Sequence, residues 1–310
     1  MKKKKALVTG GAGFIGSHLC DRLFEEDFDV YVVDNLSKGR IENLNKKVDF
    51  FKININSPKF LKLLGILKPN IIFHLAAQSS ISNSLKDPKK DFQTNLFSTL
   101  KLLEKSRKIK IEKIIFTSSA AIFGKAERLP IDEKYPRNPI SYYGISKLCS
   151  EYFFQNYYKS YQMPYVCLRL ANVYGPRQDA SGEGGVVAIF ANNIIKKTPL
   201  VIYGEGEQTR DFIYISDVID ALIRSLDERT IDNFNIGTST QTSINHLANK
   251  LISIDDNKPV RIMHRPQRFS EVEKSSLSYQ KFSRVTGFKP KVNLDKGLKK
   301  TINYFYQSIN

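Results

Sequence analysis

The sequence is poor in cysteine and contains no long apolar run. Its three cysteines, Cys20, Cys149 and Cys167, have the spacing of neither a disulfide framework nor a metal site. No signal peptide is recognisable, and no stretch is long and apolar enough to cross a membrane. These absences predict a cytoplasmic protein with no membrane-spanning segment and no metal ion.

Acidic residues are scarce relative to basic ones. The chain has 31 Asp and Glu against 48 Lys and Arg, which gives a formal net charge of +17. A nucleic-acid-binding protein would gather this charge into a recognition motif interleaved with aromatic residues, but here the lysines are scattered. We therefore expect no nucleic-acid partner, and a solvated basic surface that attracts anionic small molecules.

Repeats, low-complexity segments and obvious linkers are also missing, and apolar runs alternate instead with amphipathic stretches. Six short runs rich in Val, Ile and Phe predict strands at Ala6–Thr9, Val30–Val33, Phe50–Ile53, Ile71–His74, Lys113–Thr117 and Tyr165–Leu170. Helical periodicity predicts helices at Phe14–Phe24, Asp91–Lys105, Gly144–Lys159, Asp217–Leu226 and Leu294–Phe305. This order favours an α/β fold of the Rossmann type, a doubly wound parallel sheet, with the part after about residue 170 folding back as a smaller lobe.

Four glycines fall within the seven residues Gly10–Gly16, between the first predicted strand and the first predicted helix. In that position a G-x-G-x-x-G pattern predicts dinucleotide binding, because glycines let the backbone approach a pyrophosphate at a helix N-terminus. Asp34 ends the second predicted strand and is placed to accept hydrogen bonds from a ribose diol, which favours NAD over NADP. Lys38 and Arg40 weaken that preference, and a glycine-rich turn without a ligand is the alternative.

A second constellation lies in "SYYGISK", where Tyr143 and Lys147 are four residues apart and share one helix face. A neighbouring ammonium and a cationic nicotinamide ring above the phenol both favour the phenolate, so we expect the pKa of Tyr143 to be lowered and Tyr143 to act as a general base. Ser119 follows the fifth predicted strand, at the carboxyl edge where parallel sheets place active-site residues. The alternative interpretation of the Tyr–Lys spacing is a pair on a helix surface.

Several motifs together resemble the extended short-chain dehydrogenases/reductases, and most of all their UDP-glucose 4-epimerase branch. They are "TGGAGFIG", "HLAAQ", "SSAAIFG", "YYGISK", "RLANVYGPRQ" and "GEGEQTRDFIYISDV", and they span nearly the whole chain. The resemblance implies a domain that holds NAD, at 1–167 plus about 211–240. It also implies a smaller C-terminal domain for a nucleotide-sugar, at 168–210 plus 241–310, and a homodimer.

The resemblance assigns roles to individual residues. It implies a catalytic set of Ser119, Tyr143 and Lys147. It implies cofactor contacts at Gly10, Gly13, Phe14, Ile15, Asp34, Asn35, Ser37, Asn54, Ile55, Leu75, Ala76, Ala77, Asn95, Tyr143 and Lys147. It implies substrate contacts at Ser119, Asn172, Val187, Ile202, Tyr203, Arg210, Arg268, Glu271 and Ser275.

The substrate residues divide by chemistry. Arg210 and Arg268 resemble the family's diphosphate clamp, for which guanidinium groups are suited, although surface charges are the alternative interpretation. Glu271 occupies the place of the acid that binds the uridine ribose. Ser275, seven residues beyond Arg268, occupies the position that limits the group at C2 of the sugar. Serine leaves that space open, which predicts that N-acetylated UDP-hexoses are accepted together with plain ones.

The chain departs from the family pattern at three places. Asn54 replaces an acidic residue beside the adenine, and Phe123 replaces a common tyrosine. Ala120 and Ala121 follow Ser119, where 4,6-dehydratases that resemble this chain carry an Asp–Glu pair. Without that acid and base, dehydration is disfavoured.

The sequence thus predicts a UDP-sugar 4-epimerase that inverts C4 through a 4-keto sugar and retains its NAD. Two alternatives stay open. One is an NAD-dependent dehydratase, decarboxylase or reductase of the same family. The other is a non-catalytic NAD-sensing regulator, against which the Ser–Tyr–Lys set argues.

Overall fold

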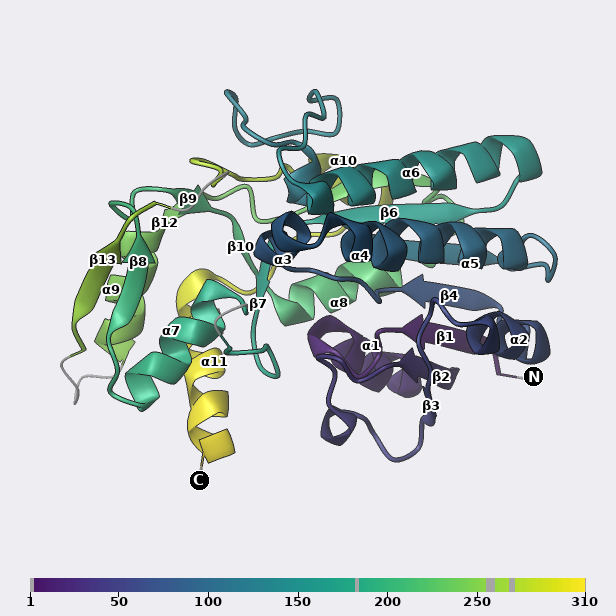
Figure 1. Ribbon diagram of the computed structural model, residues 1–310, viewed down its shortest axis with the longest axis horizontal. Coiled ribbons are helices and arrows are strands. Elements are labelled where there is room, and N and C mark those ends of the chain that lie inside the picture. Colours follow the sequence, from purple (N-terminus) through teal and green to yellow (C-terminus); the bar gives the residue numbers. More distant parts are fainter. Residues whose placement is uncertain (1–2, 182–183, 255–259, 268–270, 310) are drawn as a thin grey trace.

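The computed structural model describes residues 3–181, 184–254, 260–267 and 271–309. Its larger lobe contains a seven-stranded sheet in which all neighbouring strands run parallel, in the order β11, β6, β5, β4, β1, β2, β3 (Figure 1). The strands are β1 Lys5–Thr9, β2 Asp29–Asp34, β3 Asp49–Lys52, β4 Ile71–His74, β5 Lys113–Ser119, β6 Tyr165–Leu170 and β11 Asp232–Ile236. The expected Rossmann-type α/β fold is confirmed.

Both faces of this sheet are apolar and covered by helices. Successive side chains of a strand point to opposite sides, so a strand with apolar residues throughout contributes to both faces. In β1, Leu7 belongs to one buried cluster and Val8 to the other. The Val8 side is covered by α1 (Phe14–Glu25) and α8 (Ile215–Arg224). The Leu7 side is covered by α2 (Pro58–Leu67), α5 (Ser98–Ser106) and α6 (Tyr142–Tyr161). A parallel sheet buried on both faces is the arrangement that the apolar runs predict.

The prediction of one continuous helix at Asp91–Lys105 is wrong. The segment Asp91–Lys105 is split among α4 (Pro88–Phe92), a π-helical turn η2 (Gln93–Phe97) and α5. The backbone carbonyl of Asn95 accepts hydrogen bonds from the hydroxyls of Thr99, at 2.6 Å, and Ser150, at 3.3 Å. Side-chain hydroxyls that bond to backbone carbonyls compete with the regular helical ladder, and π turns occur where that ladder is interrupted.

The smaller lobe is assembled from segments after residue 170 (Figure 1). It contains β7 Asn172–Tyr174, α7 Val186–Ile195, β8 Leu200–Tyr203, β9 Thr209–Arg210, β10 Phe212–Tyr214, β12 Thr242–Ser243, α9 Ile244–Ile254, β13 Ile262–Arg265 and α11 Leu294–Ile309. Helix α10 (Gln280–Thr286) instead packs against β11 of the large sheet, where Phe282 contacts Phe234. Three short helical segments belong to the part of the chain before residue 170: η1 Ile41–Asn43, α3 Ile81–Lys86 and η3 Ala120–Ile122. Small two-stranded sheets pair β10 with β7, β12 with β9 and β13 with β8.

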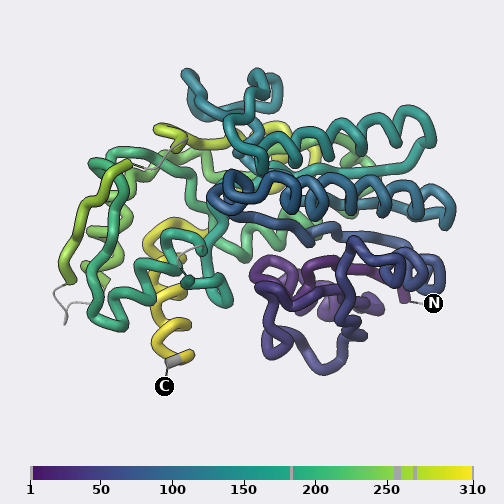
Figure 2. The backbone as a smooth tube through the Cα atoms, in the orientation of Figure 1, coloured from purple at the N-terminus to yellow at the C-terminus, as the bar shows by residue number. Residues whose placement is uncertain are grey.

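The path of the chain crosses between the lobes more than once (Figure 2). After the β7–β9 segment, α8 and β11 return to the large sheet, where β11 pairs with β6. The division into two domains at the boundaries given above stays a prediction. No helix in the described ranges is long and apolar enough to cross a membrane. All three cysteines are free thiols.

Candidate active site

The loop from β1 to α1 is shaped by glycine. Gly10 has a φ of +72°, and a Cβ on it would lie 2.8 Å from the backbone nitrogen of Ala76. A Cβ on Gly16 would lie 2.2 Å from the carbonyl oxygen of Gly10. Helix α1 begins after Gly13, and neither a capping side chain nor an acidic residue occupies its first turn. These features fit a pyrophosphate, which needs close backbone approach and N–H donors at a helix N-terminus.

Asp34 ends β2 directly beside this loop. Its Oδ2 accepts a hydrogen bond from the backbone N–H of Ala12 at 3.1 Å, and its Oδ1 accepts one from Leu36 at 2.8 Å. Burial raises the pKa of Asp34, and these backbone hydrogen bonds oppose the rise. A Cβ on Gly39 would lie 2.9 Å from Asp34 Oδ2. The carboxylate is therefore fixed where a ribose diol bound beside the glycine loop would meet it, and the chain fits NAD.

Ser119, Tyr143 and Lys147 come together at the carboxyl edge of the sheet. Ser119 ends β5, and its hydroxyl accepts a hydrogen bond from the N–H of Ala121 at 3.2 Å. Tyr143 lies in the first turn of α6, is half-buried, and has a side-chain hydrogen bond with Ser119. Lys147 is 2% exposed, and its Nζ donates to the carbonyl oxygen of Thr117 at 2.8 Å. The predicted catalytic residues are therefore neighbours.

The chain without its cofactor does not by itself lower the pKa of Tyr143. Burial raises this pKa to about 12, and the hydrogen bond with Ser119 only partly opposes it. The Lys147 Nζ lies 5.9 Å from the centre of the Tyr143 ring and 4.5 Å from that of Phe116. Burial also lowers the pKa of Lys147 to about 8. Desolvation is the largest cause for both groups, so the phenolate needs a further positive charge.

The loop after β4 borders the glycine loop. Leu75, Ala76 and Ala77 follow this strand, and Ala76 lies against Gly10. The amide of Asn95 is hydrogen-bonded to protein partners: Oδ1 accepts from the N–H of Gln78 at 2.8 Å, and Nδ2 donates to its carbonyl at 3.0 Å. The described contacts of Asn95 therefore hold this loop in place, and the cofactor contact that the resemblance implies for Asn95 stays a prediction.

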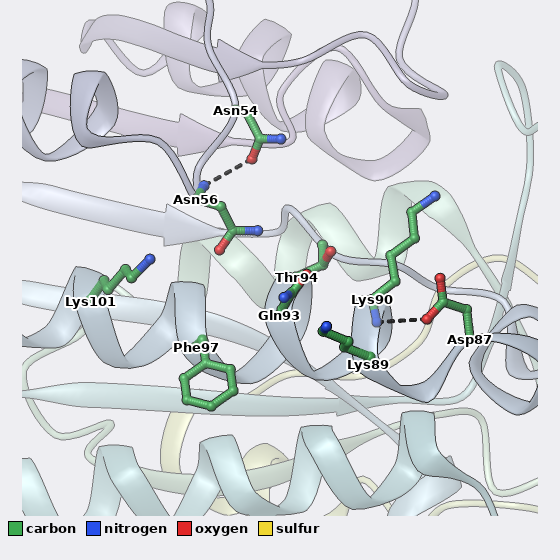
Figure 3. Close-up of a pocket in the computed structure, with 9 residues that line it drawn as sticks. All are labelled: Asn54, Asn56, Asp87, Lys89, Lys90, Gln93, Thr94, Phe97 and Lys101. Atoms are coloured by element: carbon green, nitrogen blue, oxygen red, sulfur yellow. Dashed lines mark hydrogen bonds between the residues drawn. The ribbon is translucent and has the colours of Figure 1, made fainter.

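A cavity of about 750 Å³ lies between the loop after β3 and the outer side of α4, η2 and α5 (Figure 3). Its lining comprises Asn54, Asn56, Asp87, Lys89, Lys90, Gln93, Thr94, Phe97 and Lys101. Of the predicted cofactor residues only Asn54 is among them, and its Oδ1 accepts from the N–H of Asn56 at 2.9 Å. The neighbouring Ile55 is buried. The cavity holds none of the predicted catalytic residues.

The predicted anion clamp is formed in part by β9. One Arg210 nitrogen donates to Glu271 Oε1 at 3.1 Å and another to the carbonyl of Thr209 at 2.8 Å. Burial lowers the pKa of Arg210, and Glu271 opposes this. The Ser275 N–H donates to the Thr209 carbonyl at 3.2 Å, so Ser275 lies beside Arg210 through the backbone. Arg268 lies outside the described residues.

Two predicted base-contacting residues are not placed for that role. Val187 and Ile202 are each 1% exposed and belong to the hydrophobic core, because their helix and strand turn these side chains inward. They present no surface to a ligand, and this expectation is corrected. Tyr203 is half-buried, and Asn172 in β7 is exposed.

Sequence reasoning missed three buried polar residues around the site. Each ring nitrogen of His74 is hydrogen-bonded to a threonine hydroxyl: Nδ1 to Thr9 at 2.8 Å and Nε2 to Thr99 at 3.1 Å. Glu151 forms a buried ion pair with Arg169 at 2.7 Å. Asp91 is buried beneath α6. The period of four between Asp91 and Asn95, and between Lys147 and Glu151, is the signal that could have shown these side chains to share a helix face.

Residues 7–301 match the family model described as GDP-mannose 4,6 dehydratase. The chain belongs to this family of extended short-chain dehydrogenases/reductases. This family member is 37% identical over 308 residues to the UDP-glucose 4-epimerase of Mycolicibacterium smegmatis, covering 97% of this chain and 98% of that one.

Solved structures agree with that assignment. The UDP-glucose 4-epimerase of Thermotoga maritima with UDP-glucose is 40% identical, with a TM-score of 0.95, covering 99% of this chain and 100% of that one. The Thermus thermophilus UDP-glucose 4-epimerase in complex with NAD is 36% identical, with a TM-score of 0.93, covering 97% and 99%.

Proposed function

We propose that this family member is an NAD-dependent UDP-sugar 4-epimerase. The observation that carries the proposal is the Ser119–Tyr143–Lys147 set at the end of β5, followed by Ala120 and Ala121. These alanines bring no carboxyl group to the position where a 4,6-dehydratase resembling this chain would carry its Asp–Glu pair. The similarity to UDP-glucose 4-epimerases over nearly the whole chain supports the same conclusion.

The chain's own residues handle the proton. Tyr143 removes the proton of the C4 hydroxyl of the sugar, and Ser119, already hydrogen-bonded with Tyr143, orients that hydroxyl. Lys147 is held by Thr117 so that its ammonium stabilises the phenolate. NAD, when bound, supplies the hydride acceptor and donor for C4 and a positive charge that favours the phenolate. If the 4-keto sugar turns while its diphosphate stays bound, C4 is inverted.

Binding of the diphosphate requires a change of partner at Arg210. Its guanidinium is paired with Glu271, and a diphosphate would replace that carboxylate with a stronger bidentate acceptor. Glu271 would then be free for the ribose hydroxyls of uridine. We propose Arg268 as the second arginine of the clamp, because it precedes Glu271 by three residues in the sequence.

The sugar specificity follows from Ser275. Its backbone N–H donates to the Thr209 carbonyl of β9, beside Arg210, and a side chain as small as serine would leave room for an acetamido group at C2. We therefore propose that UDP-GlcNAc and UDP-GalNAc are substrates together with UDP-glucose and UDP-galactose. A Ser275→Tyr substitution should reduce kcat/KM for UDP-GlcNAc at least tenfold and leave UDP-glucose within about threefold, because packed pockets yield little. Undiminished N-acetyl activity in this variant would remove Ser275 from the pocket.

The experiment that tests the function is product analysis by NMR. Purified protein is incubated with UDP-, GDP-, CDP- and dTDP-sugars, and the products are identified. We expect C4 epimers of UDP-hexoses and no net formation of NADH. Loss of carbon dioxide or water from the sugar, or stoichiometric NADH, would favour the decarboxylase, dehydratase or reductase alternative. NAD binding without any product would favour the regulator.

We also propose a homodimer formed through the outward faces of η2, α5 and α6. Four aromatic side chains are exposed on these elements: Phe97, Tyr142, Tyr152 and Tyr161. Apolar surface gathered on neighbouring helices marks a protein–protein contact more often than an isolated exposed residue does. Sedimentation velocity should give a dimer, and a Phe97→Lys, Tyr152→Lys double variant should give a monomer. A monomeric wild type would contradict the proposal.

The cytoplasmic location stays a prediction.

A further inference from the structure

Asp91 is a fully buried carboxylate whose described hydrogen-bond donors are all neutral. Its Oδ1 accepts from Gln78 Nε2 at 2.9 Å and from Asn95 Nδ2 at 3.0 Å. Its Oδ2 accepts from Ser146 Oγ at 2.7 Å. The side chain is 0% exposed. An ionised carboxylate is costly to bury unless its charge is compensated. The three donors to Asp91 are neutral, so the compensating positive charge must come from another group in the site.

The three donors come from the elements that shape the catalytic site. Gln78 belongs to the loop after β4, Asn95 to η2, and Ser146 to α6. Ser146 lies between the two catalytic residues of α6, and its hydroxyl is also 3.0 Å from the carbonyl oxygen of Tyr143. Asp91 therefore holds the catalytic turn of α6 against the loop that borders the dinucleotide site.

Asp91 also acts electrostatically on both catalytic groups. It is the foremost of the groups that oppose the lowering of the pKa of Lys147, and it raises the pKa of Tyr143. Lys147 is further influenced by Glu151 on α6 and Cys167 on β6, and it lies against Phe116 and the Thr117 carbonyl on β5.

Among the residues that the structure describes, the other titratable groups near Lys147 are paired or neutral. Glu151 is already paired with Arg169. Burial raises the pKa of the Cys167 thiol well above its ordinary value, so it is neutral. On β4, burial lowers the pKa of His74 to about 3, so it is neutral too. Facing Tyr143 are Asp91 and the neutral Ser119. Asp91 is thus the carboxylate whose charge is left to balance the ammonium.

We propose that Asp91 is a positioning residue of the active site: its carboxylate fixes the α6 turn carrying Tyr143 and Lys147 and is the buried countercharge of the Lys147 ammonium. This inference rests on the proposed function, in which Lys147 must be charged and Tyr143 must lose its proton.

The test is Asp91→Asn, which removes the charge and can keep the hydrogen bonds. The amide oxygen can accept from Gln78 and Asn95 as Oδ1 does. The amide nitrogen can donate to Ser146 Oγ, whose own hydroxyl then donates to the Tyr143 carbonyl. Asp87→Asn is the matched control, because Asp87 is exposed at the start of the same helix and asparagine can keep its cap on the N–H of Lys90.

The expected result is a shift of the pH profile. Without Asp91 the Lys147 ammonium and the Tyr143 phenol both lose their protons more easily. Both limbs of the kcat/KM profile should therefore move to lower pH, by about one unit, and Asp87→Asn should match the wild type. Unmoved limbs in Asp91→Asn, with or without a loss of kcat, would overturn the countercharge role.

A second readout is independent of turnover. In holoenzyme labelled with ¹³C-lysine, the ε-carbon signal of Lys147 is assigned by its absence in Lys147→Met and is followed as the pH rises. Its titration midpoint should be lower in Asp91→Asn than in the wild type and in Asp87→Asn. An unchanged midpoint would overturn the inference. If the wild type showed no epimerisation but the midpoint moved, the proposed function would fail and the assignment of Asp91 would stand.

Discussion

The two halves of the candidate site are held in different ways. At the carboxyl edge of the large sheet, the groups are fixed by hydrogen bonds that a ligand need not break, such as the Lys147–Thr117 bond of 2.8 Å and the Asp34 bonds to the backbone. In the smaller lobe, Arg210 is paired with Glu271, and a diphosphate would compete for it. The first half is built before ligands arrive. In the second half, a diphosphate would compete with Glu271 for Arg210, so the two halves should respond differently to substitution.

The largest effect is expected at the fixed half. Tyr143→Phe removes the proton acceptor and should lower kcat about a thousandfold, while the glycine loop and Asp34 still hold NAD. Turnover of UDP-glucose and the NAD released on denaturation measure the two properties separately. Wild-type activity in this variant would sink the assignment of the base.

The fixed half should also contribute more to stability. Glu151→Gln leaves Arg169 buried without its partner, and it also changes the acceptor of Ser118 Oγ, which lies 2.6 Å from Glu151 Oε1. Its free energy of unfolding should fall by about 3 kcal/mol in urea titrations. Glu26→Gln, which breaks the exposed pair with Arg22, is the control and should change little. Equal effects of the two substitutions would mean that the network is not structural.

Acid should weaken the fixed half through His74. Burial lowers the pKa of this imidazole from 6.5 to about 3, so between these values the unfolded chain binds a proton that the folded chain does not. The stability that His74 contributes above pH 6.5 is therefore lost as the pH falls. The loss is about 2 kcal/mol at pH 5. Urea titrations at pH 7 and pH 5 should show this loss in the wild type and a smaller one in His74→Gln. An equal loss in both would remove His74 as the cause.

The smallest effect is expected at the exchangeable half. Arg210→Ala should raise KM for UDP-sugars about tenfold, because only one of two proposed clamp residues is lost. It should lower the free energy of unfolding less than Glu151→Gln does, because the Arg210 and Glu271 side chains are 16% and 17% exposed. Arg210→Lys should recover part of the affinity, since it restores the charge but not the planar fork. A large loss of stability in Arg210→Ala would show that this arginine belongs to the fixed half.

The sequence predicts the fixed half better than the other. Local sequence patterns were enough to predict the glycine loop, Asp34 at the end of β2 and the shared helix face of Tyr143 and Lys147. Each of these features depends only on residues that are near each other in the sequence. The burial of Val187 and Ile202 depends on how the smaller lobe packs, and no local pattern carries that information.

Buried polar groups are the second kind of failure. Polar residues four apart, such as Asp91 and Asn95, look like a solvated helix face, but in the fold that face turns inward toward α6. The pKa of Tyr143 is raised in the chain without cofactor, because desolvation depends on everything packed around the phenol and not only on Lys147. The lowering expected with a nicotinamide bound stays a prediction.

In the proposed reaction, hydride leaves C4 of the sugar, stays within the site and returns to the opposite face. The most direct test uses UDP-glucose deuterated at C4, in ordinary water, with NMR of the products. We expect UDP-galactose that keeps its deuterium at C4, with none lost to solvent and no NADH accumulating. Loss of the deuterium to water, or UDP-glucose consumed without an inverted product, would contradict this proposal.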